Sequence, residues 1–312
     1  MMRLDETTSG VFVIAPTPFR EDGAVDFGSI PRMVDFFLAR EVQGLTILGV
    51  MGEASKLTEQ EALQITRAVL HAVAERVPVV VGLPASGFAP MQSLAAAVMD
   101  AGAAGVMVAP APYLRGDAAI LKYFETAAEF LGQAQFVLQD YPQGSGVQIP
   151  PTLIRRIVDT IPICVMLKHE DWPGLDKLTW LRTASEREGM RRISILTGNG
   201  GLFLPDELRR GADGAMTGFA FPEMMRDVIR AHGAGDIQGA ADLFDAYLPL
   251  VRYEQQPGIG LAVRKQVLAQ RGAISSPAQR RPCVQLGSHD VEDILFLLGR
   301  QEKRLAALGA AP

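Results

Sequence analysis

The sequence predicts an α/β fold, a (β/α)8 TIM barrel with a C-terminal helical extension. Eight short apolar stretches, each followed by an amphipathic one, fill residues 1–234, and this alternation is typical of a closed parallel sheet surrounded by helices. A glycine-led pattern recurs at residues 102–107 (GAAGVM) and 211–216 (GADGAM), as a repeated helix–turn–strand unit would produce. An open doubly wound sheet is the alternative, but no GxGxxG motif follows the first stretch.

The apolar stretches are interpreted as strands because they are short and lack helical periodicity. They are expected at residues 11–15, 44–49, 77–83, 103–108, 135–138, 163–168, 193–197 and 213–217. Helices are expected between them, at residues 30–40, 58–76, 95–99, 118–130 and 175–187. A further helix begins at Pro150 and Pro151. Thr58, with Glu61 three residues later, forms a capping-box signature at one helix start.

The strand pattern stops at residue 235. Apolar residues then recur at helical spacing, which predicts helices at residues 237–253, 259–271 and 291–308. We expect a barrel of residues 1–234 and C-terminal helices of residues 235–312 that pack on it as one structural unit.

Composition excludes several classes of function. Among the 312 residues, 48% are hydrophobic and the net charge is -5, without a basic stripe, so nucleic acid is not an expected partner. No apolar run reaches the length of a membrane span, and the polar N-terminus lacks the core of a signal peptide, which predicts a cytoplasmic protein that does not bind membranes. Two cysteines and four histidines show no metal-ligand spacing, so no metal is expected. An organic cofactor is not expected either.

Lys168 is the first functional candidate. It follows five apolar residues, and a strand buried on both faces has no ordinary reason to end in an ammonium group. Burial disfavours the charged form, and a free amine can attack a carbonyl to form a Schiff base. A lysine that extends from the strand end into water is the alternative. Active sites of such barrels lie at the carboxyl ends of the strands, and Lys168 alone among six lysines ends a buried strand, which favours a catalytic amine.

Two further catalytic candidates lie close to this lysine. Glu170 is two residues after Lys168, so it could face the same side and move a proton as acid or base. Pairing with a nearby cation is the alternative for this carboxylate. Gln139 ends the preceding strand, where its amide could orient the substrate or a water molecule.

Candidates for substrate binding come from the other strand ends: Gly52, Glu53, Ser55, Tyr113, Asn199 and Thr217. Asn199 lies among glycines that let the backbone approach a ligand. Ser55 could bind a carboxylate, or its hydroxyl could bond its own backbone. Glu53 is favoured as a cap of the following loop, and Thr217 faces either the lumen or the helices.

Several motifs occur in order along the chain: Gly49-x-x-Gly52-Glu53, Leu57-Thr58, Pro142, Lys168 and Gly198-Asn199. This arrangement, over residues 10–300, resembles the dihydrodipicolinate synthase / N-acetylneuraminate lyase family. The resemblance implies a class I aldolase-type lyase in which Lys168 forms an imine with a 2-keto acid. It also implies a homotetramer, in which Tyr113 contacts a neighbouring subunit.

The chain departs from the synthase at several positions. Val50 and Met51 stand where the synthase has two threonines, and neither side chain donates a hydrogen bond. Its relay tyrosine corresponds to Gln139, its interface tyrosine to Leu114, and its substrate-binding arginine to Gly144. These departures count against synthase activity, because a proton carrier is missing.

Other motifs resemble a branch that contains 2-keto-3-deoxy sugar-acid dehydratases, notably 2-keto-3-deoxy-L-arabonate dehydratase: Gln139-Asp140-x-Pro142-x-x-Ser145-Gly146, Lys168-x-Glu170, Gly214-Ala215-Met216-Thr217-Gly218 and Leu248-Pro249-Leu250. The leading hypothesis is therefore a lyase that forms a Schiff base with a small-molecule 2-keto acid and dehydrates or cleaves a 2-keto-3-deoxy sugar acid. Dihydrodipicolinate synthase is the alternative enzyme. A catalytically silent keto-acid-binding protein is the alternative of another class.

Overall fold

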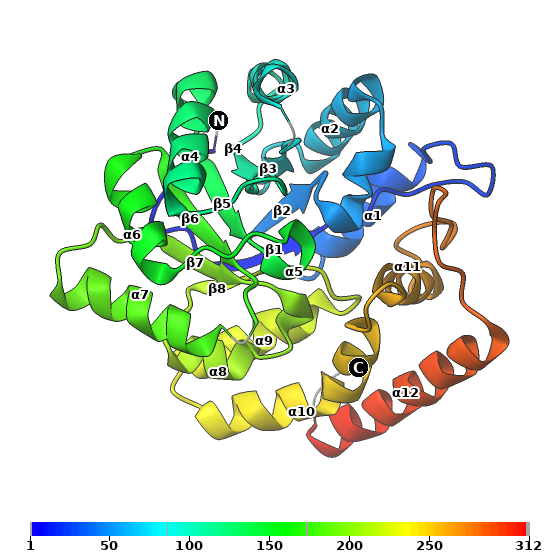
Figure 1. The fold of residues 1–312 in the computed structure, drawn as a ribbon. Coiled ribbons are helices and arrows are strands. Elements are labelled where there is room, and N and C mark those ends of the chain that lie inside the picture. Colours follow the sequence, from blue (N-terminus) through cyan, green and yellow to red (C-terminus); the bar gives the residue numbers. More distant parts are fainter. Residues whose placement is uncertain (1, 86, 173, 310–312) are drawn as a thin grey trace.

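A closed barrel of eight parallel strands forms the centre of the computed structural model, which describes residues 2–85, 87–172 and 174–309 (Figure 1). The strands are β1 Gly10–Ile14, β2 Gly44–Ile47, β3 Val79–Gly82, β4 Gly105–Val108, β5 Phe136–Asp140, β6 Cys164–His169, β7 Ser194–Thr197 and β8 Gly214–Thr217. Each strand pairs with the next, and β8 closes the ring on β1 with Val11 opposite Ala215. The predicted TIM barrel is confirmed, and its carboxyl ends converge on one face.

Helices surround the sheet, as the alternating pattern predicts. They are α1 Ser29–Leu38, α2 Glu59–Val73, α3 Phe88–Asp100, α4 Asp117–Leu131, α5 Pro142–Ser145, α6 Pro151–Thr160, α7 Leu175–Arg187, α8 Leu204–Arg209 and α9 Pro222–Gly233. Short 3-10 turns follow two strands: η1 Val50–Gly52, η2 Ala54–Lys56 and η3 Asn199–Gly201. The predicted capping box is present, because Thr58 and Glu61 bond each other's backbone N–H groups.

Several elements differ in length from their predictions, and α3 and β5 are two examples. Helix α3 begins at Phe88, seven residues before the predicted start at residue 95, because Pro90 lies in its first turn, where proline is tolerated. Strand β5 extends beyond residue 138 because Gln139 pairs with Lys168 and Asp140 with His169. Because both residues are polar, the apolar pattern of the sequence predicts a strand that ends two residues earlier.

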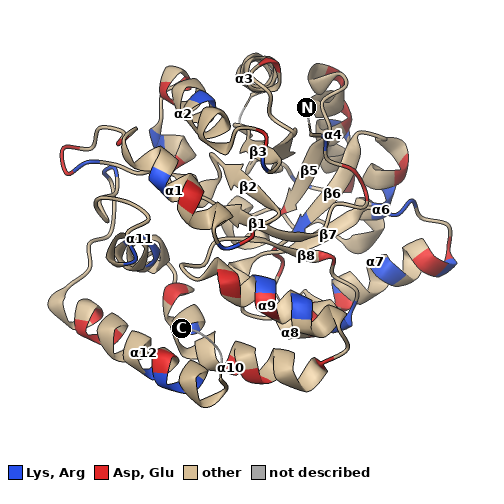
Figure 2. Cartoon of the chain, turned by 180° about the vertical axis from the view of Figure 1, so that it is seen from behind, with Lys and Arg blue, Asp and Glu red and all other residues tan. Residues whose placement is uncertain are grey.

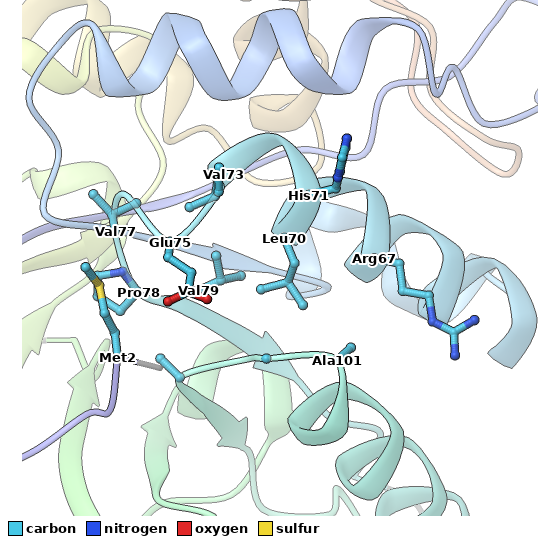
Figure 3. Close-up of a pocket in the computed structure, with 13 residues that line it drawn as sticks. Met2, Arg67, Leu70, His71, Val73, Glu75, Val77, Pro78, Val79 and Ala101 are labelled. Atoms are coloured by element: carbon cyan, nitrogen blue, oxygen red, sulfur yellow. The ribbon is translucent and has the colours of Figure 1, made fainter.

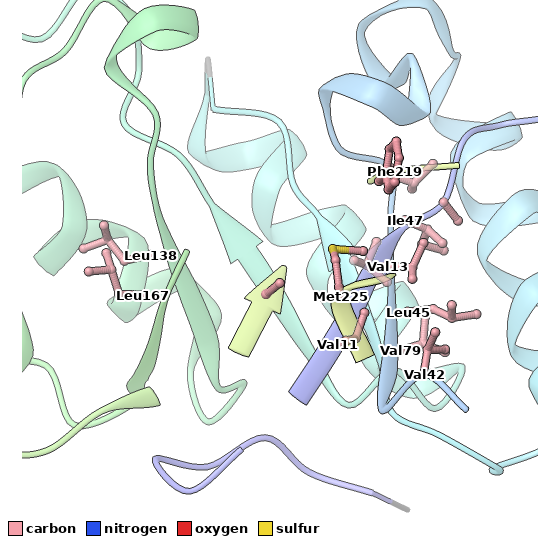
Figure 4. Packing of buried hydrophobic residues seen from close by; sticks show 14 of the residues in the cluster. Val11, Val13, Val42, Leu45, Ile47, Val79, Leu138, Leu167, Phe219 and Met225 are labelled. Atoms are coloured by element: carbon pink, nitrogen blue, oxygen red, sulfur yellow. The ribbon is translucent and has the colours of Figure 1, made fainter. Parts of the chain in front are cut away.

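Side chains of the strands alternate between two cores. Figure 4 shows Val11, Val13, Leu138 and Leu167 in the outer core, between the sheet and the helices. Their neighbours along the strands form a second core inside the barrel, which includes Phe12, Ile14, Val137 and Met166. The alternation places Lys168, two residues after Met166, in the row that faces the lumen.

Three helices complete the chain, namely α10 Ile237–Glu254, α11 Gly260–Gln270 and α12 Ser288–Ala307. Helix α10 packs against α9 of the barrel, and both α11 and α12 contact α10. Acidic and basic residues are interspersed on the outer helices α7, α8 and α12 (Figure 2). Among the described helices, none combines the length and apolar character that a membrane crossing requires.

Candidate active site

Lys168 lies at the carboxyl end of β6, inside the barrel and 5% exposed. Its Nζ is 2.8 Å from Oε2 of Glu170, an ion pair between two buried side chains. The carboxylate two residues further on faces the same side of the strand, as the two-residue period of a strand predicts, and the alternative that Glu170 pairs with a nearby cation is observed. The alternative of a lysine extending into water is excluded.

A cavity of about 90 Å³ surrounds this ion pair at the carboxyl ends of the strands. Its wall comes from six strand ends, from the residue that follows α10 and from helix α11. The lining residues are Ile14, Val50, Met51, Gln139, Tyr141, Lys168, Glu170, Asn199, Gly200, Thr217, Gly218, Gln255 and Arg264. The structure therefore brings the three predicted catalytic candidates together with Asn199 and Thr217.

Glu170 is the centre of the hydrogen-bond network in the cavity. Its Oε2 accepts a hydrogen bond from Nε2 of Gln139 at 2.8 Å and forms the ion pair with Nζ of Lys168 at the same distance. Gly198 at the end of β7 makes room for this side chain, because a Cβ there would lie 2.1 Å from Cγ of Glu170. Burial, together with the charge of Glu170, raises the pKa of Tyr141, so this phenol stays protonated at neutral pH. One carboxylate is thus in contact with the amine and in position to exchange protons.

The loop after β7 closes another side of the cavity. Thr217 is buried and its Oγ1 accepts the N–H of Gly200 at 2.8 Å, so this threonine lines the lumen and holds the loop. Asn199 has a φ of 51° and its Nδ2 donates to the carbonyl of Glu170 at 3.3 Å. These two residues shape the wall beside Glu170.

Four predicted substrate-binding residues do not line the cavity: Gly52, Glu53, Ser55 and Tyr113. Ser55 is exposed, and Tyr113 is 63% exposed on the loop after β4. The carbonyl of Gly52 accepts Oγ1 of Thr17 at 2.6 Å. Within one chain, these residues therefore have structural or surface positions.

Glu53 is buried beneath the loop that follows β2. Its carboxylate accepts Nζ of Lys265 at 2.6 Å, Nζ of Lys56 at 2.8 Å and the N–H of Arg280 at 3.0 Å. The sequence predicts that Glu53 caps the following loop through backbone N–H groups. It accepts just one backbone N–H, so its main contacts are ion pairs. Burial lowers the pKa of Lys265, and the charge of Glu53 opposes that change. Glu53 joins the cavity wall at Val50 and Met51 to the C-terminal helices.

Two residues that sequence reasoning did not single out reach the cavity from the extension. Gln255 follows α10, and Arg264 belongs to α11, where its Nε donates to buried Glu254. The pattern of helix α11 does indicate that its cations are buried. Arg264 and Lys265 are adjacent in a turn whose flanking residues Val263 and Val267 are also buried, so the helix has no face that is left for two solvated cations.

The outer face of β6 is separate from this cavity. His169 is buried there, with Nε2 2.9 Å from the carbonyl of Gly174, so it faces away from Lys168 as expected. Asp140, which lies opposite His169 in the sheet, accepts Nζ of Lys177 at 2.8 Å. In the described part of the chain, no group of three or more His, Cys, Asp or Glu side chains is arranged to hold a metal ion.

Two larger cavities lie at the other end of the barrel, beside the amino ends of the strands. One, of about 530 Å³, lies between α2 and the starts of β3 and β4 (Figure 3), where Arg67, His71 and Glu75 are its ionisable residues. The other, of about 550 Å³, is lined by residues of α3 and by those that precede β5 and β6. Neither contains a predicted site residue, and in TIM barrels the chemistry lies at the opposite face.

Comparison with known proteins agrees with this geometry. The sequence matches the Dihydrodipicolinate synthetase family over residues 7–296. The chain belongs to this family. It is therefore a class I aldolase-type enzyme, a lyase of the Dihydrodipicolinate synthetase family.

Relatives within this family carry different names. L-2-keto-3-deoxyarabonate dehydratase of Azospirillum brasilense is 28% identical over 93% of this chain and 94% of its own length. 4-Hydroxy-tetrahydrodipicolinate synthase of Sorangium cellulosum is 30% identical over 96% of this chain and 98% of its own. A crystal structure from Rhodopseudomonas palustris, described as dihydrodipicolinate synthase, is 50% identical with a TM-score of 0.94, over 96% of this chain and all of that chain.

The buried contact between Glu53 and Lys265 generates a stability prediction. Lys265→Met should lower the free energy of unfolding by about 3 kcal/mol, because it leaves a buried carboxylate with fewer partners. We expect the lower end of the range for such pairs, since Lys56 and the N–H of Arg280 still contact Glu53. Chemical denaturation measures this loss.

A second substitution and a control sharpen the measurement. Lys265→Met combined with Glu53→Gln should recover part of the loss, because the unpaired charge is gone. Lys303→Met on the exposed face of α12 should change stability by less than about 0.5 kcal/mol. Equal stability of Lys265→Met and the unaltered enzyme would refute the role of this pair.

Proposed function

We propose that this lyase forms a Schiff base between Nζ of Lys168 and a 2-keto acid, and that it dehydrates or cleaves a 2-keto-3-deoxy sugar acid. The buried contact of the Lys168 amine with Glu170, at 2.8 Å within the cavity, carries the proposal. It combines a nucleophile with a group that can accept and return its proton.

The first step makes the imine. A proton leaves the ammonium group of Lys168 for Glu170, and the free amine adds to the C2 carbonyl of the substrate. The carbonyl oxygen leaves as water once it has been protonated, and Glu170 returns to it the proton that it took from Lys168. Gln139 holds the Glu170 carboxylate through Nε2 during these transfers.

The second step uses the imine as an electron sink. In dehydration, Glu170 removes a proton from C3 to give an enamine, and the C4 hydroxyl takes up a proton and leaves as water. In cleavage, the bond between C3 and C4 breaks instead, and an aldehyde is released. Hydrolysis of the imine then frees the product and restores Lys168.

The choice of substrate rests on the relatives and on the cavity wall. A family member named L-2-keto-3-deoxyarabonate dehydratase matches 93% of the chain, which supports the sugar-acid reaction. Dihydrodipicolinate synthase is the second candidate, because the Sorangium and Rhodopseudomonas relatives bear that name. Against it, the apolar Val50 and Met51 and the amide of Gln139 line this cavity, and none of them can act as the hydroxyl relay that the resemblance assigns to these positions.

The amine can be tested by chemical trapping. We expect incubation with pyruvate followed by borohydride to give a reduced adduct on Lys168, located by mass spectrometry of peptides. Lys168→Arg should give no adduct, because a guanidinium group does not form an imine. Lys303→Arg, on the exposed face of α12, should react as the unaltered enzyme does. No adduct, or one on another lysine, contradicts the proposal.

The reaction and the role of Glu170 can be tested together with 2-keto-3-deoxy-L-arabonate. We expect 2-ketoglutarate semialdehyde from dehydration, and Glu170→Gln should slow its formation by about 10²–10⁴-fold, the usual contribution of a general base. Chromatography with mass detection measures the products.

The other outcomes separate the alternatives. Pyruvate plus an aldehyde would show cleavage, and condensation of pyruvate with aspartate semialdehyde would show the synthase. Adduct formation without turnover of any of these compounds would favour the catalytically silent keto-acid-binding protein. A Glu170→Gln enzyme as fast as the unaltered one would remove Glu170 from the mechanism.

We also propose that the enzyme acts in the cytoplasm as a homo-oligomer, a tetramer by family resemblance. Exposed apolar side chains on the loop after β4 and on α12 support an association surface: Tyr113, Leu295 and Phe296. Analytical ultracentrifugation should give about four times the 33.6 kDa of one chain, and a monomer at micromolar concentration would contradict this. Cell fractionation should place the enzyme with the cytoplasm, and its recovery elsewhere would overturn that location.

A further inference from the structure

Arg264 is an unusual part of the cavity, because it comes from α11 and not from the barrel. The residue is 2% exposed. Its Nε donates to Oε1 of Glu254 at 2.5 Å, and Oε2 of Glu254 accepts the N–H of Ala220. Among the described residues, Nη1 of Arg264 has no hydrogen-bond partner. One side of the guanidinium is therefore held, and the other retains a free donor.

The end of β8 makes room for this free donor. A Cβ on Gly218 would lie 2.1 Å from Nη1 and 2.7 Å from Cζ of Arg264, so another residue there would displace the guanidinium. The same Cβ would lie 3.1 Å from the carbonyl oxygen of Ile14. Nη1 therefore lies against the ends of β8 and β1, whose residues Gly218 and Ile14 line the cavity that contains Lys168.

The charges of the cavity indicate what the free donor binds. Its ionisable lining residues are Tyr141, Lys168, Glu170 and Arg264. Lys168 already contacts Glu170 and, in the proposed reaction, bonds to C2 of the substrate. Val50 and Met51 on the same wall offer no side-chain donor. Of the two cations in the lining, Arg264 is therefore the one that remains to bind the negative charge of an incoming substrate.

A carboxylate fits this donor in charge and in geometry. A buried donor without an acceptor costs free energy, and a guanidinium group binds a carboxylate through short, charge-assisted hydrogen bonds. Every 2-keto acid carries a carboxylate on the carbon next to the one that reacts. In a cavity of about 90 Å³, a ligand that is bonded to Lys168 keeps that carboxylate close to the walls.

We propose that Arg264 binds the carboxylate next to the reacting keto group of the substrate. This inference rests on the proposed Schiff base at Lys168 and adds a recognition residue to it. It gives the C-terminal extension a direct part in substrate binding, and Glu254 positions the guanidinium for that contact.

The test compares an acid with its uncharged ester. Pyruvate and methyl pyruvate have the same keto group, but the ester lacks the negative charge. Neither carries the hydroxylated chain of a sugar acid beyond C3. Borohydride trapping on Lys168 at increasing ligand concentration gives a half-saturating concentration for each. Arg264→Met should raise that value for pyruvate about 10- to 100-fold, the effect of losing a charge-assisted hydrogen bond, and leave that for methyl pyruvate almost unchanged.

Two variants control for structure. Arg264→Lys should recover part of the preference for the acid, because it keeps the charge but not the planar fork. Arg271→Met breaks the ion pair of Arg271 with Glu223, also near α11 but outside the cavity lining, and should leave both values unchanged. If Arg264→Met alone does not fold, the comparison uses Arg264→Met with Glu254→Gln, which removes the buried unpaired charge.

The outcomes separate this inference from the function on which it rests. Equal weakening for pyruvate and for its ester would show a purely structural role for Arg264 and overturn the inference. Unchanged trapping of pyruvate would also overturn it, and the Schiff base would stand in both cases. If the unaltered enzyme gives no adduct with either ligand, the proposed function fails, and this inference fails with it.

Discussion

The buried contact between Glu53 and Lys265 is the interaction on which the arrangement of the cavity depends. It joins the turn after β2, which presents Val50 and Met51, to the helix that presents Arg264. Glu53 itself has a φ of 55°, an unfavourable conformation that its three polar partners hold in place. Breaking one member of a buried pair is strongly unfavourable, so the cavity wall and the extension are expected to keep their relative positions. A barrel alone would leave this side of the site open.

Much of the fold can be predicted from the alternation of apolar and amphipathic stretches along the sequence. Strands of a parallel barrel are apolar on both faces, and helices between them are amphipathic, so eight alternations indicate the closed sheet. The same two-residue period indicates that Lys168 and Glu170 share one face. Errors of extent occur where local composition conflicts with tertiary structure. Polar Gln139 at the end of β5 and Pro90 in the first turn of α3 are the examples.

The site divides into a predictable part and a part that is not predictable from one sequence. Residues at strand ends, such as Asn199 and Thr217, are found because topology alone brings the carboxyl ends together. Arg264 enters from a helix beyond the barrel, and no spacing rule relates such a helix to the strand ends. The role of Glu170 beside Lys168 is not decided by spacing, because the same position allows both an ion pair and proton transfer.

The charges around the cavity suggest how one site can be stable when empty and reactive when filled. Lys168 balances Glu170, and Arg264 balances Glu254, so the empty site holds two compensated pairs at limited cost. In the proposed reaction, a substrate carboxylate occupies the free side of Arg264, and the imine ties up the amine. Glu170 then still accepts a hydrogen bond from Nε2 of Gln139, while Lys168 is covalently bonded to the substrate. The protonated imine keeps a positive charge beside Glu170 and withdraws electrons from C3, so the neighbouring carboxylate is placed to accept the C3 proton.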